Sequence, residues 1–412
     1  MREAFIVGIG MTKFGVHADK TTADLGREAT QLALDEAGIE AKDLDVAFYA
    51  NTVQGAIEGQ YGMKGQHALR SIGVQGMPLF NVENACAGSS SALNLAFAQV
   101  AGGFADIALA VGSEKLHTPD REKRLAAFGQ PEDVAQVSAF VEKYSELVSD
   151  IQPPPDVVID PKLRSIFMDA YSVLARLHMK KFGTTWEQIA AISAKNHHHS
   201  TMNPLAQYQK DMSVEEILKA RVISWPLTLP MCAPVSDGGA AAIVVSKDVL
   251  KRFDEKKAIR ILASAVKGGA DRPVDDLEHS CCRRAANAAF DQAGIARSDI
   301  SVAEVHDASS YAEIAQVEMV GLCDFGEGGP LAEQGAFSLG GRIPTNVSGG
   351  LESKGHPVAA TGIGQIYELV QHLRGDAGAR QVDGAKYAVA STSGGFMGVE
   401  DGATAVTILG KA

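Results

Sequence analysis

The sequence predicts an α/β protein made of two similar halves, and two observations support this prediction. Short apolar segments alternate with segments of helical period along the 412 residues, a pattern typical of a mainly parallel sheet covered by helices on both faces. Residues 26–47 also match residues 282–303 at a constant offset. The identical positions include Ala29 and Ala285, Asp35 and Asp291, and Gly38 and Gly294. A duplicated α/β unit explains both observations.

The first half is expected to alternate strands and helices from its start. The predicted strands cover residues 5–10, 45–50, 78–82 and 105–112, and the predicted helices run from Thr22 to Gly38 and from Ala92 to Gly103. Glycine is common where helices end, because it adopts the left-handed conformation at low cost. We expect the strand at 78–82 to be buried and Leu95 to face inward with the other apolar residues of its helix.

A region of different character, residues 116–230, separates the two halves. It contains a charged helical stretch over 120–143, a break at prolines 153–155, and amphipathic helices over 166–182 and 186–199. Several of its residues are basic, namely Lys162, Arg164, Arg176, Lys180, Lys181 and Lys195. We therefore expect an inserted, exposed lobe with local positive charge. The expected domains are residues 1–115 with 231–256, the inserted region 116–230, and residues 257–412.

The second half is expected to begin near residue 260 and to repeat the same alternation. Its predicted elements are a strand over 301–308, a loop over 346–357, a helix over 359–373, a strand over 387–390, a glycine-rich turn over 391–398 and a closing strand over 403–409. The loop and helix at 346–373 correspond to the segment around Cys86 in the first half. This correspondence places His356 near the mirror position of Cys86.

Composition limits the possible functions. The net charge of -12 argues against a nucleic-acid partner. No segment is apolar over the ~18 residues that a membrane helix needs, and the apolar run near the start is too short for a signal peptide. Five cysteines at irregular spacing, without a CxxC pair, indicate neither a disulfide framework nor a zinc site. We expect a cytoplasmic protein without a metal.

Cys86 is the first candidate for chemistry. It is expected where a strand passes into the N-terminus of a helix, and unpaired N–H groups there favour the thiolate and can hold an oxyanion. The alternative is a small buried cysteine that packs like alanine. Small residues on both sides of Cys86 leave room for a ligand and favour the first interpretation.

Two histidines and a glycine pair are expected at the same end of the sheet. His306, His356 and Gly394-Gly395 all follow predicted strands or precede helices, and ligands of such sheets bind at strand ends. A cysteine with a histidine provides a nucleophile and its base, while a second histidine would stabilise an enolate or an oxyanion. The consecutive His197-His198-His199 point about 100° apart on a helix, which disfavours a metal site. The glycine pairs lack a dinucleotide-binding pattern.

These segments resemble the thiolase superfamily. The resemblance rests on NACAGSSSA around Cys86, VHDA at His306, NVSGGLESKGHPVAATG around His356 and the final SGGFMG, and it is nearest to the sterol-carrier-protein-type, lipid-transfer-like thiolases. It implies a five-layer αβαβα fold with two duplicated α/β halves, an inserted loop domain over the coenzyme A site, and a homodimer or tetramer.

The resemblance also implies roles for individual residues. Cys86 would be the acyl-accepting nucleophile, and His356 would activate it and line one oxyanion hole. The N–H groups of Cys86 and Gly394 would form the second oxyanion hole. His306 takes the place of an asparagine in degradative thiolases. We further expect four substrate-binding residues: Asn346, Ser348, Gly349 and Tyr311.

Two departures from the family pattern concern the second catalytic cysteine. The C-terminal CxG motif of many thiolases is Thr392-Ser393-Gly394 here, and the alternative position two residues after the histidine is Ala308. Nothing around Cys323 supports it as a replacement. His306 is therefore the expected proton shuttle, with Tyr311 as the less favoured choice. A pattern without this cysteine resembles thiolases that work with a small zinc-ribbon/OB-fold partner protein.

The resemblance implies an acyl-CoA C-acyltransferase. The expected reaction is thiolytic cleavage of a 3-oxoacyl-CoA, or the reverse Claisen condensation, through a Cys86 acyl-enzyme. Coenzyme A and acyl-CoA are substrates, and no covalently bound cofactor is expected. Two alternatives remain: a partner-dependent retro-aldolase acting on 3-hydroxyacyl-CoA side chains, and a non-catalytic lipid or acyl-CoA binding protein. The acyl group and the physiological direction stay open.

Overall fold

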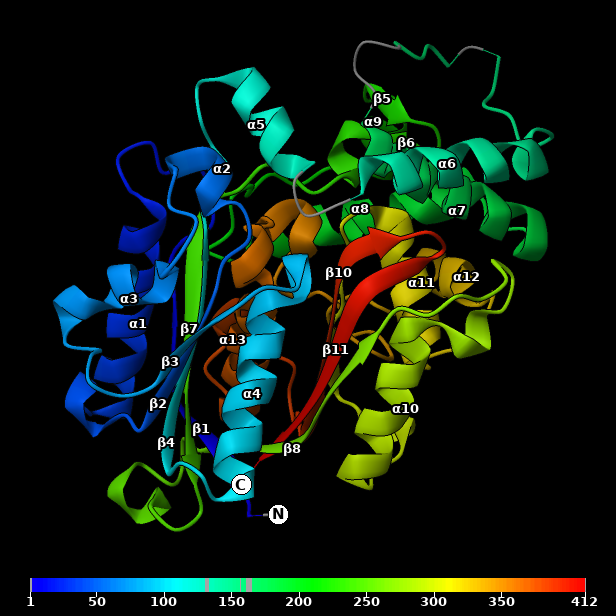
Figure 1. Cartoon of the computed structure of the whole chain (residues 1–412). Coiled ribbons are helices and arrows are strands. Elements are labelled where there is room, and N and C mark those ends of the chain that lie inside the picture. Colours follow the sequence, from blue (N-terminus) through cyan, green and yellow to red (C-terminus); the bar gives the residue numbers. More distant parts are fainter. Residues whose placement is uncertain (1, 130–132, 156, 161–164, 412) are drawn as a thin grey trace.

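The computed structural model describes residues 2–129, 133–155, 157–160 and 165–411. The chain forms the five-layer αβαβα arrangement expected from the resemblance (Figure 1). The central layer consists of α4 (Gly88–Gly102) and α13 (Thr361–Arg374), which pack against each other and against both parts of the sheet. The outer layers are formed by α1 (Thr22–Ala37) with α3 (Lys64–Leu69) on one side and α10 (Cys281–Ala293) on the other.

A nine-stranded sheet runs through both β layers in the order β3-β2-β4-β7-β1-β8-β11-β10-β9. The strands are β1 (Ala4–Met11), β2 (Val46–Ala50), β3 (Leu79–Val82), β4 (Ile107–Glu114), β7 (Gly238–Ser246), β8 (Ile259–Gly268), β9 (Val302–Glu304), β10 (Tyr387–Met397) and β11 (Glu400–Lys411). The halves join where β1 pairs with β8, and only Ala4, Phe5 and Ile6 of β1 take part in that pairing.

The repeat predicted from the sequence is confirmed. The order β2-β4-β7-β1 in the first half corresponds to β9-β10-β11-β8 in the second. At equivalent positions α1 ends at Gly38 with φ 69° and α10 ends at Gly294 with φ 66°. A left-handed residue at a helix end is cheapest as glycine, which lacks the Cβ that would strain this conformation.

The prediction of a mainly parallel sheet is wrong, because the sheet is mixed. Only the pairs β2–β3, β2–β4 and β9–β10 are parallel. Strand β7 returns from the inserted region and lies antiparallel between β1 and β4. Strands β10 and β11 form a hairpin that turns near Gly398 (φ 68°). The alternation of strands and helices in the sequence does not reveal that β7 and β11 run antiparallel to their neighbours.

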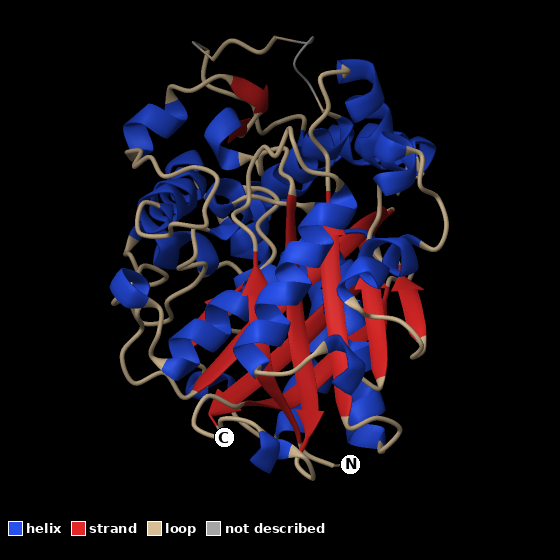
Figure 2. Cartoon of the chain, turned by 90° about the vertical axis from the view of Figure 1, so that its left-hand side faces the viewer, coloured by secondary structure: helices blue, strands red, loops and turns tan. Residues whose placement is uncertain are grey.

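The inserted region lies over one end of the sheet, and the N and C termini lie at the other end (Figures 1 and 2). Its helices are α5 (Arg121–Phe128), α6 (Val134–Ser145), α7 (Ile166–Phe182), α8 (Trp186–Ser200) and α9 (Val214–Leu218), with two short strands, β5 (Val222–Ser224) and β6 (Leu227–Thr228). The single charged stretch expected over 120–143 thus contains two helices. Helix α8 packs against α11 (Ser310–Val320) and α12 (Gly328–Glu333) of the second half.

Three local expectations need correction. Lys195 is not part of an exposed basic cluster, because it is 8% exposed and its Nζ lies 2.8 Å from Glu313. Strand β3 is at the sheet edge rather than buried, and Phe80 on it is 52% exposed. Leu95 is 39% exposed, because it lies on the outer side of α4. Lys162 and Arg164 lie outside the described residues.

No helix in the described ranges is both long and apolar enough to cross a bilayer.

Candidate active site

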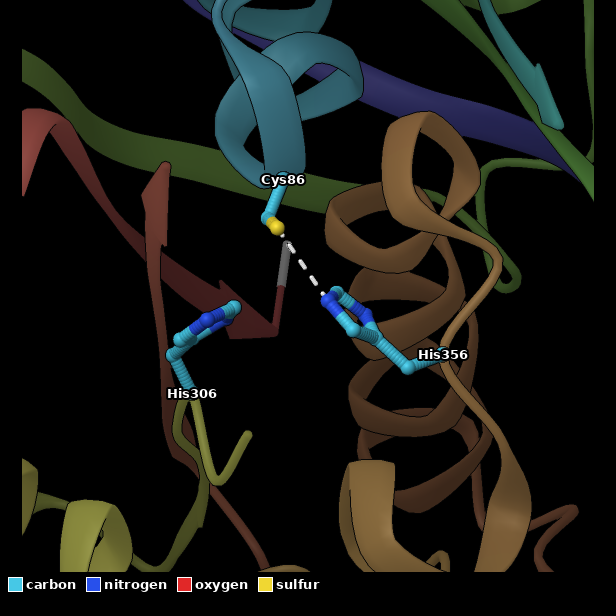
Figure 3. A group of neighbouring side chains, drawn as sticks. All are labelled: Cys86, His306 and His356. Atoms are coloured by element: carbon cyan, nitrogen blue, oxygen red, sulfur yellow. Dashed lines mark hydrogen bonds between the residues drawn. The ribbon is translucent and has the colours of Figure 1, made fainter. Parts of the chain in front are cut away.

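Three side chains predicted from the sequence meet in space. Cys86 Sγ and one ring nitrogen each of His306 and His356 lie within 4.8 Å of one another. Cys86 comes from the turn before α4, His306 follows β9, and His356 precedes α13. Figure 3 shows the two imidazole rings approaching the thiol from different segments of the second half. The site is therefore assembled from both halves of the repeat.

The turn that carries Cys86 is short and has an unusual backbone. The segment η3 (Ala85–Ala87) leads directly into α4, so the thiol lies at the N-terminal, positive end of a buried helix. Ala85 has φ 45°, a left-handed conformation that non-glycine residues adopt at a cost and that is frequent at functional sites. Cys86 is only partly buried, unlike a small core residue.

His356 is oriented to accept a proton from Cys86. Thr361 Oγ1 donates its hydrogen to the carbonyl of Pro357 at 3.2 Å, so the same oxygen accepts from His356 Nδ1–H at 2.7 Å. This leaves the lone pair on Nε2, which lies 3.1 Å from Cys86 Sγ. The hydrogen-bond chain thus fixes the tautomer that a general base needs.

We predict that Thr361→Val lowers kcat of acyl transfer by about tenfold or more, because Nδ1 loses its acceptor and the ring loses its fixed tautomer. KM should change little, whereas the melting temperature should fall by a few degrees, because the buried Nδ1–H and the Pro357 carbonyl lose their partner. Thr361→Ser should restore the rate. Steady-state kinetics of the three proteins test this, and an equal loss in the serine variant would contradict a positioning role for the hydroxyl.

His306 differs from His356 because its ring has no fixed partner. Its Nδ1 is buried and has no hydrogen-bond partner among the described residues, and the His306 and His356 rings lie 5.4 Å apart at an angle of 78°. Burial lowers the pKa of His306 to about 4. Burial and the neighbouring His306 also lower the pKa of His356. Both rings are therefore neutral at pH 7 and available for proton transfer.

Gly394 lies against the Cys86 turn. A Cβ at Gly394 would be 2.1 Å from the carbonyl oxygen of Asn84 and 3.0 Å from the backbone nitrogen of Cys86, so only glycine fits without displacing the turn. The prediction of a glycine-rich turn at 391–398 is wrong here, because β10 continues through this segment. Gly395 has a positive φ of 71°, and the register of β10 with β11 is the same on both sides of it.

The other predicted residues occupy different positions. Asn346 and Ser348 are fully buried and bond to the carboxylates of Glu313 and Glu304, at 2.8 and 2.6 Å. Gly349 packs against Ser200. These three residues pack beneath the site. They do not line either of the two cavities found among the described residues, one beside His306 and one beside Gly394. Tyr311 does line a cavity, together with His306.

The position of the missing second cysteine is not open to the site. Thr392 is 1% exposed and its hydroxyl bonds to Gln365 and accepts from Ser90 at 3.0 Å. Cys323 is buried in another cluster, around α11. Thr392 thus belongs to the polar contacts between the halves.

A buried acid cluster behind His306 was not foreseen from the sequence, because its members are far apart in the chain. Asn196 Nδ2 donates to Asp307 at 3.1 Å and to Glu313 at 2.8 Å. The oxygens of the Glu352 carboxyl have no hydrogen-bond partner among the described residues. Burial and the nearby Glu313 raise the pKa of Glu352 to about 8, and burial also raises the pKa of Asp307.

We predict that Glu352→Gln stabilises the protein increasingly as pH rises. Ionised Glu352 is disfavoured in the fold, so the native protein loses stability between the ordinary pKa of 4.5 and about 8, whereas glutamine stays neutral. The gain at pH 8.5 should be on the order of 5 kcal/mol. Urea unfolding at pH 5 and pH 8.5 measures it, with exposed Glu187→Gln as the control. A gain that does not depend on pH would contradict the prediction.

The described residues offer limited possibilities for a metal. His197 bonds to the carbonyl of Pro230, His198 to Asp211 and His199 to the carbonyl of Asn346, so the three histidines do not converge. Cys86, His306 and His356 are the group close enough to share an ion, but Cys86 and His356 already form a hydrogen bond there. The absence of a metal from the reaction stays a prediction.

Relatives match almost the whole chain. Residues 4–221 match the family model described as the thiolase N-terminal domain, and residues 263–411 match the one described as thiolase C-terminal domain-like. The chain is 38% identical over 400 residues to sterol carrier protein 2 of Bos taurus, covering 93% of this chain and 69% of that protein. It is 34% identical over 407 residues to an acetyl-CoA acetyltransferase of Methanothermobacter thermautotrophicus, covering 97% and 98%. A solved structure titled Ltp2-ChsH2(DUF35) aldolase has a TM-score of 0.76 at 22% identity, covers 99% of this chain and 98% of that one, and shows the same fold.

Proposed function

The chain belongs to the sterol-carrier-protein-type thiolases and is a thiolase-type acyltransferase; from this premise we propose that Cys86 carries the acyl group of a 3-oxoacyl-CoA during turnover. The observation that supports this best is the 3.1 Å contact between Cys86 Sγ and the lone pair of His356 Nε2. A thiol beside a neutral imidazole of fixed tautomer becomes a nucleophile when the imidazole takes its proton.

The proposed cleavage proceeds in two transfers. His356 takes the proton of Cys86, and the thiolate attacks the 3-oxo carbon to form an oxyanion. The bond between C2 and C3 then breaks, and the acyl group stays on Cys86 while the enolate of acetyl-CoA leaves. His356 passes the proton that it took to His306, and the imidazolium of His306 then gives this proton to C2 of the enolate. A second coenzyme A thiol attacks the acyl-cysteine, releases the shortened acyl-CoA and returns a proton to Cys86.

Gly394 supports a place for the oxyanion. Its backbone is close to that of Cys86, so the N–H groups of both residues are proposed to stabilise the negative oxygen, as N–H groups at a helix start do. His356, with His306 beside it, is proposed to bind the thioester oxygen in the second oxyanion hole. Coenzyme A acts here as a substrate. The reverse sequence of steps is a Claisen condensation.

Mass spectrometry of the intact protein tests the proposal. Incubation with acetyl-CoA should add one acetyl group, which peptide mapping should place on Cys86 and free coenzyme A should remove. Cys232 serves as an internal control, because it is also only partly buried and its thiol donates to the carbonyl of Thr228. An adduct on Cys232 alone, or no adduct with acetyl-CoA and longer acyl-CoAs, would contradict the acyl-enzyme.

A retro-aldolase acting on 3-hydroxyacyl-CoA side chains is the second candidate. The observation that favours it is Thr392 at the position of the second cysteine, because the chain lacks the cysteine that serves as proton shuttle in many thiolases. Aldol cleavage also needs no acyl group on Cys86. The neighbour titled as an aldolase suggests the same test. Cleavage of a 3-hydroxyacyl-CoA by the Cys86→Ala variant would identify the aldolase. Cleavage of a 3-oxoacyl-CoA by the native protein that is lost in this variant would identify the thiolase. We also propose that the protein forms a homodimer or tetramer, is cytoplasmic, and works with a small zinc-ribbon/OB-fold partner protein.

A further inference from the structure

A cavity that is partly open to solvent has His306 in its wall. Its walls come from α7, α11, the loop before α10 and the β10–β11 hairpin. Most of the lining is apolar or aromatic, including Tyr171, Leu174, Leu277, Met319, Phe325 and Phe396. Phe140 of α6 packs edge-on against Phe396 at 5.0 Å, so the inserted region helps to close the cavity. The cavity thus leads from the proposed reaction centre into an apolar enclosure.

Arg272 is the only arginine or lysine among the described residues that line this cavity, and most of its donors are already used. Its Nε pairs with Glu400. Its terminal nitrogens donate to four backbone carbonyls, those of Pro273, Val274, Asp276 and Val399, at 3.0 to 3.4 Å. Arg272 therefore fastens the loop before α10 to the β10–β11 hairpin, and its charge is paired with that of Glu400.

The acidic lining residues give the cavity an excess of negative charge. Glu318 bonds to His178 at 2.9 Å and accepts from the backbone of Gly328 at 2.9 Å. Glu400 accepts from Arg272 and from the backbone of Cys281. Asp401 also lines the cavity. The carboxylate of a ligand that entered this cavity would lose its hydrating water and would find no unpaired cation among the described lining residues.

Two polar groups of the lining remain without partners. His306 is 3% exposed and its Nδ1 has none within the described ranges. The hydroxyl of Tyr311 has no hydrogen bond to a described residue either. Both residues line the cavity, so the polar contacts available to a ligand are neutral.

We propose that this cavity holds the acyl chain and selects uncharged apolar chains over chains that end in a carboxylate. The inference rests on the proposed function and adds the substrate class. Ala312 and Ala315, one turn apart on α11, both face the cavity, and their small side chains leave its volume open. Ala315 thereby sets the size of the acyl group that fits.

Acylation of Cys86 by matched thioesters tests the charge selection. Hexanoyl-CoA and adipoyl-CoA have six-carbon acyl chains and differ in a terminal carboxylate. Mass spectrometry should give a hexanoyl-to-adipoyl rate ratio of at least about 100. Met319→Lys adds a cation of similar length and should lower this ratio at least about tenfold, whereas Met319→Gln is the uncharged control. Equal rates with both thioesters, or equal effects of Lys and Gln, would overturn the proposal.

A second variant pair tests the size limit. Ala315→Phe should lower the hexanoyl-to-acetyl rate ratio by about tenfold or more, and Ala315→Ser, of similar volume, should not. An unchanged ratio in the phenylalanine variant would overturn the role of Ala315. Dissociation constants of the same thioesters are measured in parallel. If no thioester acylates Cys86, the proposed acyl-enzyme fails, and the order of the dissociation constants still decides the charge selection.

Discussion

Replacing Cys86 by alanine is expected to abolish acyl transfer, with kcat/KM falling by at least about 10⁴-fold. The reason is that the Cys86 thiol is the proposed nucleophile and lies 3.1 Å from His356 Nε2, and no other cysteine belongs to this group of described residues. The rate at which acetyl-CoA forms from a 3-oxoacyl-CoA and free coenzyme A measures the loss. The backbone should be unaffected, because alanine is also accepted at both neighbouring positions, Ala85 and Ala87.

Cys232→Ala is the matched control for this loss. Cys232 is partly buried like Cys86, but burial raises its pKa and its thiol bonds to a backbone carbonyl. The control should retain the native rate. If Cys86→Ala kept more than a few per cent of the activity, the acyl-enzyme route would be wrong.

Replacing His356 by asparagine is expected to lower kcat by about 10³-fold. Asparagine keeps a polar side chain near Cys86 but cannot take its proton at neutral pH. The acyl-cysteine should form slowly, and stopped-flow release of coenzyme A from acetyl-CoA measures its rate. His198→Asn is the control, because His198 lies on the exposed side of α8 and bonds to Asp211.

The pH dependence of the same rate provides an independent check. Burial lowers the pKa of His356 below its ordinary value of 6.5, and that of His306 is about 4. A base that is already neutral remains active as pH falls, so the native rate of acylation should stay constant from pH 8 to below 6.5. A decline centred at 6.5 would show that His356 titrates like a solvated imidazole.

The three residues of the proposed site could be selected from the sequence because each one follows a recognisable local pattern. Cys86, His306 and His356 all stand between a strand and a helix, and the internal repeat indicated that their segments meet. The central helices and most strand positions were predictable from hydrophobic period alone. Strand direction was not, because β7 and the β10–β11 hairpin return through connections whose course depends on the whole fold.

Residues that act through others were missed or misplaced. Thr361 orients His356 through one hydrogen bond, and a threonine at a helix start has many ordinary explanations. Asn346 and Ser348 belong to the recognisable motif, yet they bond to buried carboxylates rather than line the cavity. Those carboxylates come from β9 and α11, and only the folded chain shows that they are close.

The duplication gives the site the character of a subunit interface within one polypeptide. The copy of the unit before the inserted region contributes the proposed nucleophile, Cys86, and the copy after it contributes both imidazoles, so neither copy alone contains the cysteine–histidine pair. Their relative position depends on the contact of α4 with α13, where the Ile363 backbone donates to Ser89 Oγ at 3.1 Å. Side-chain size along these two helices therefore controls reactivity as well as stability, and substitutions in one copy must be compensated in the other.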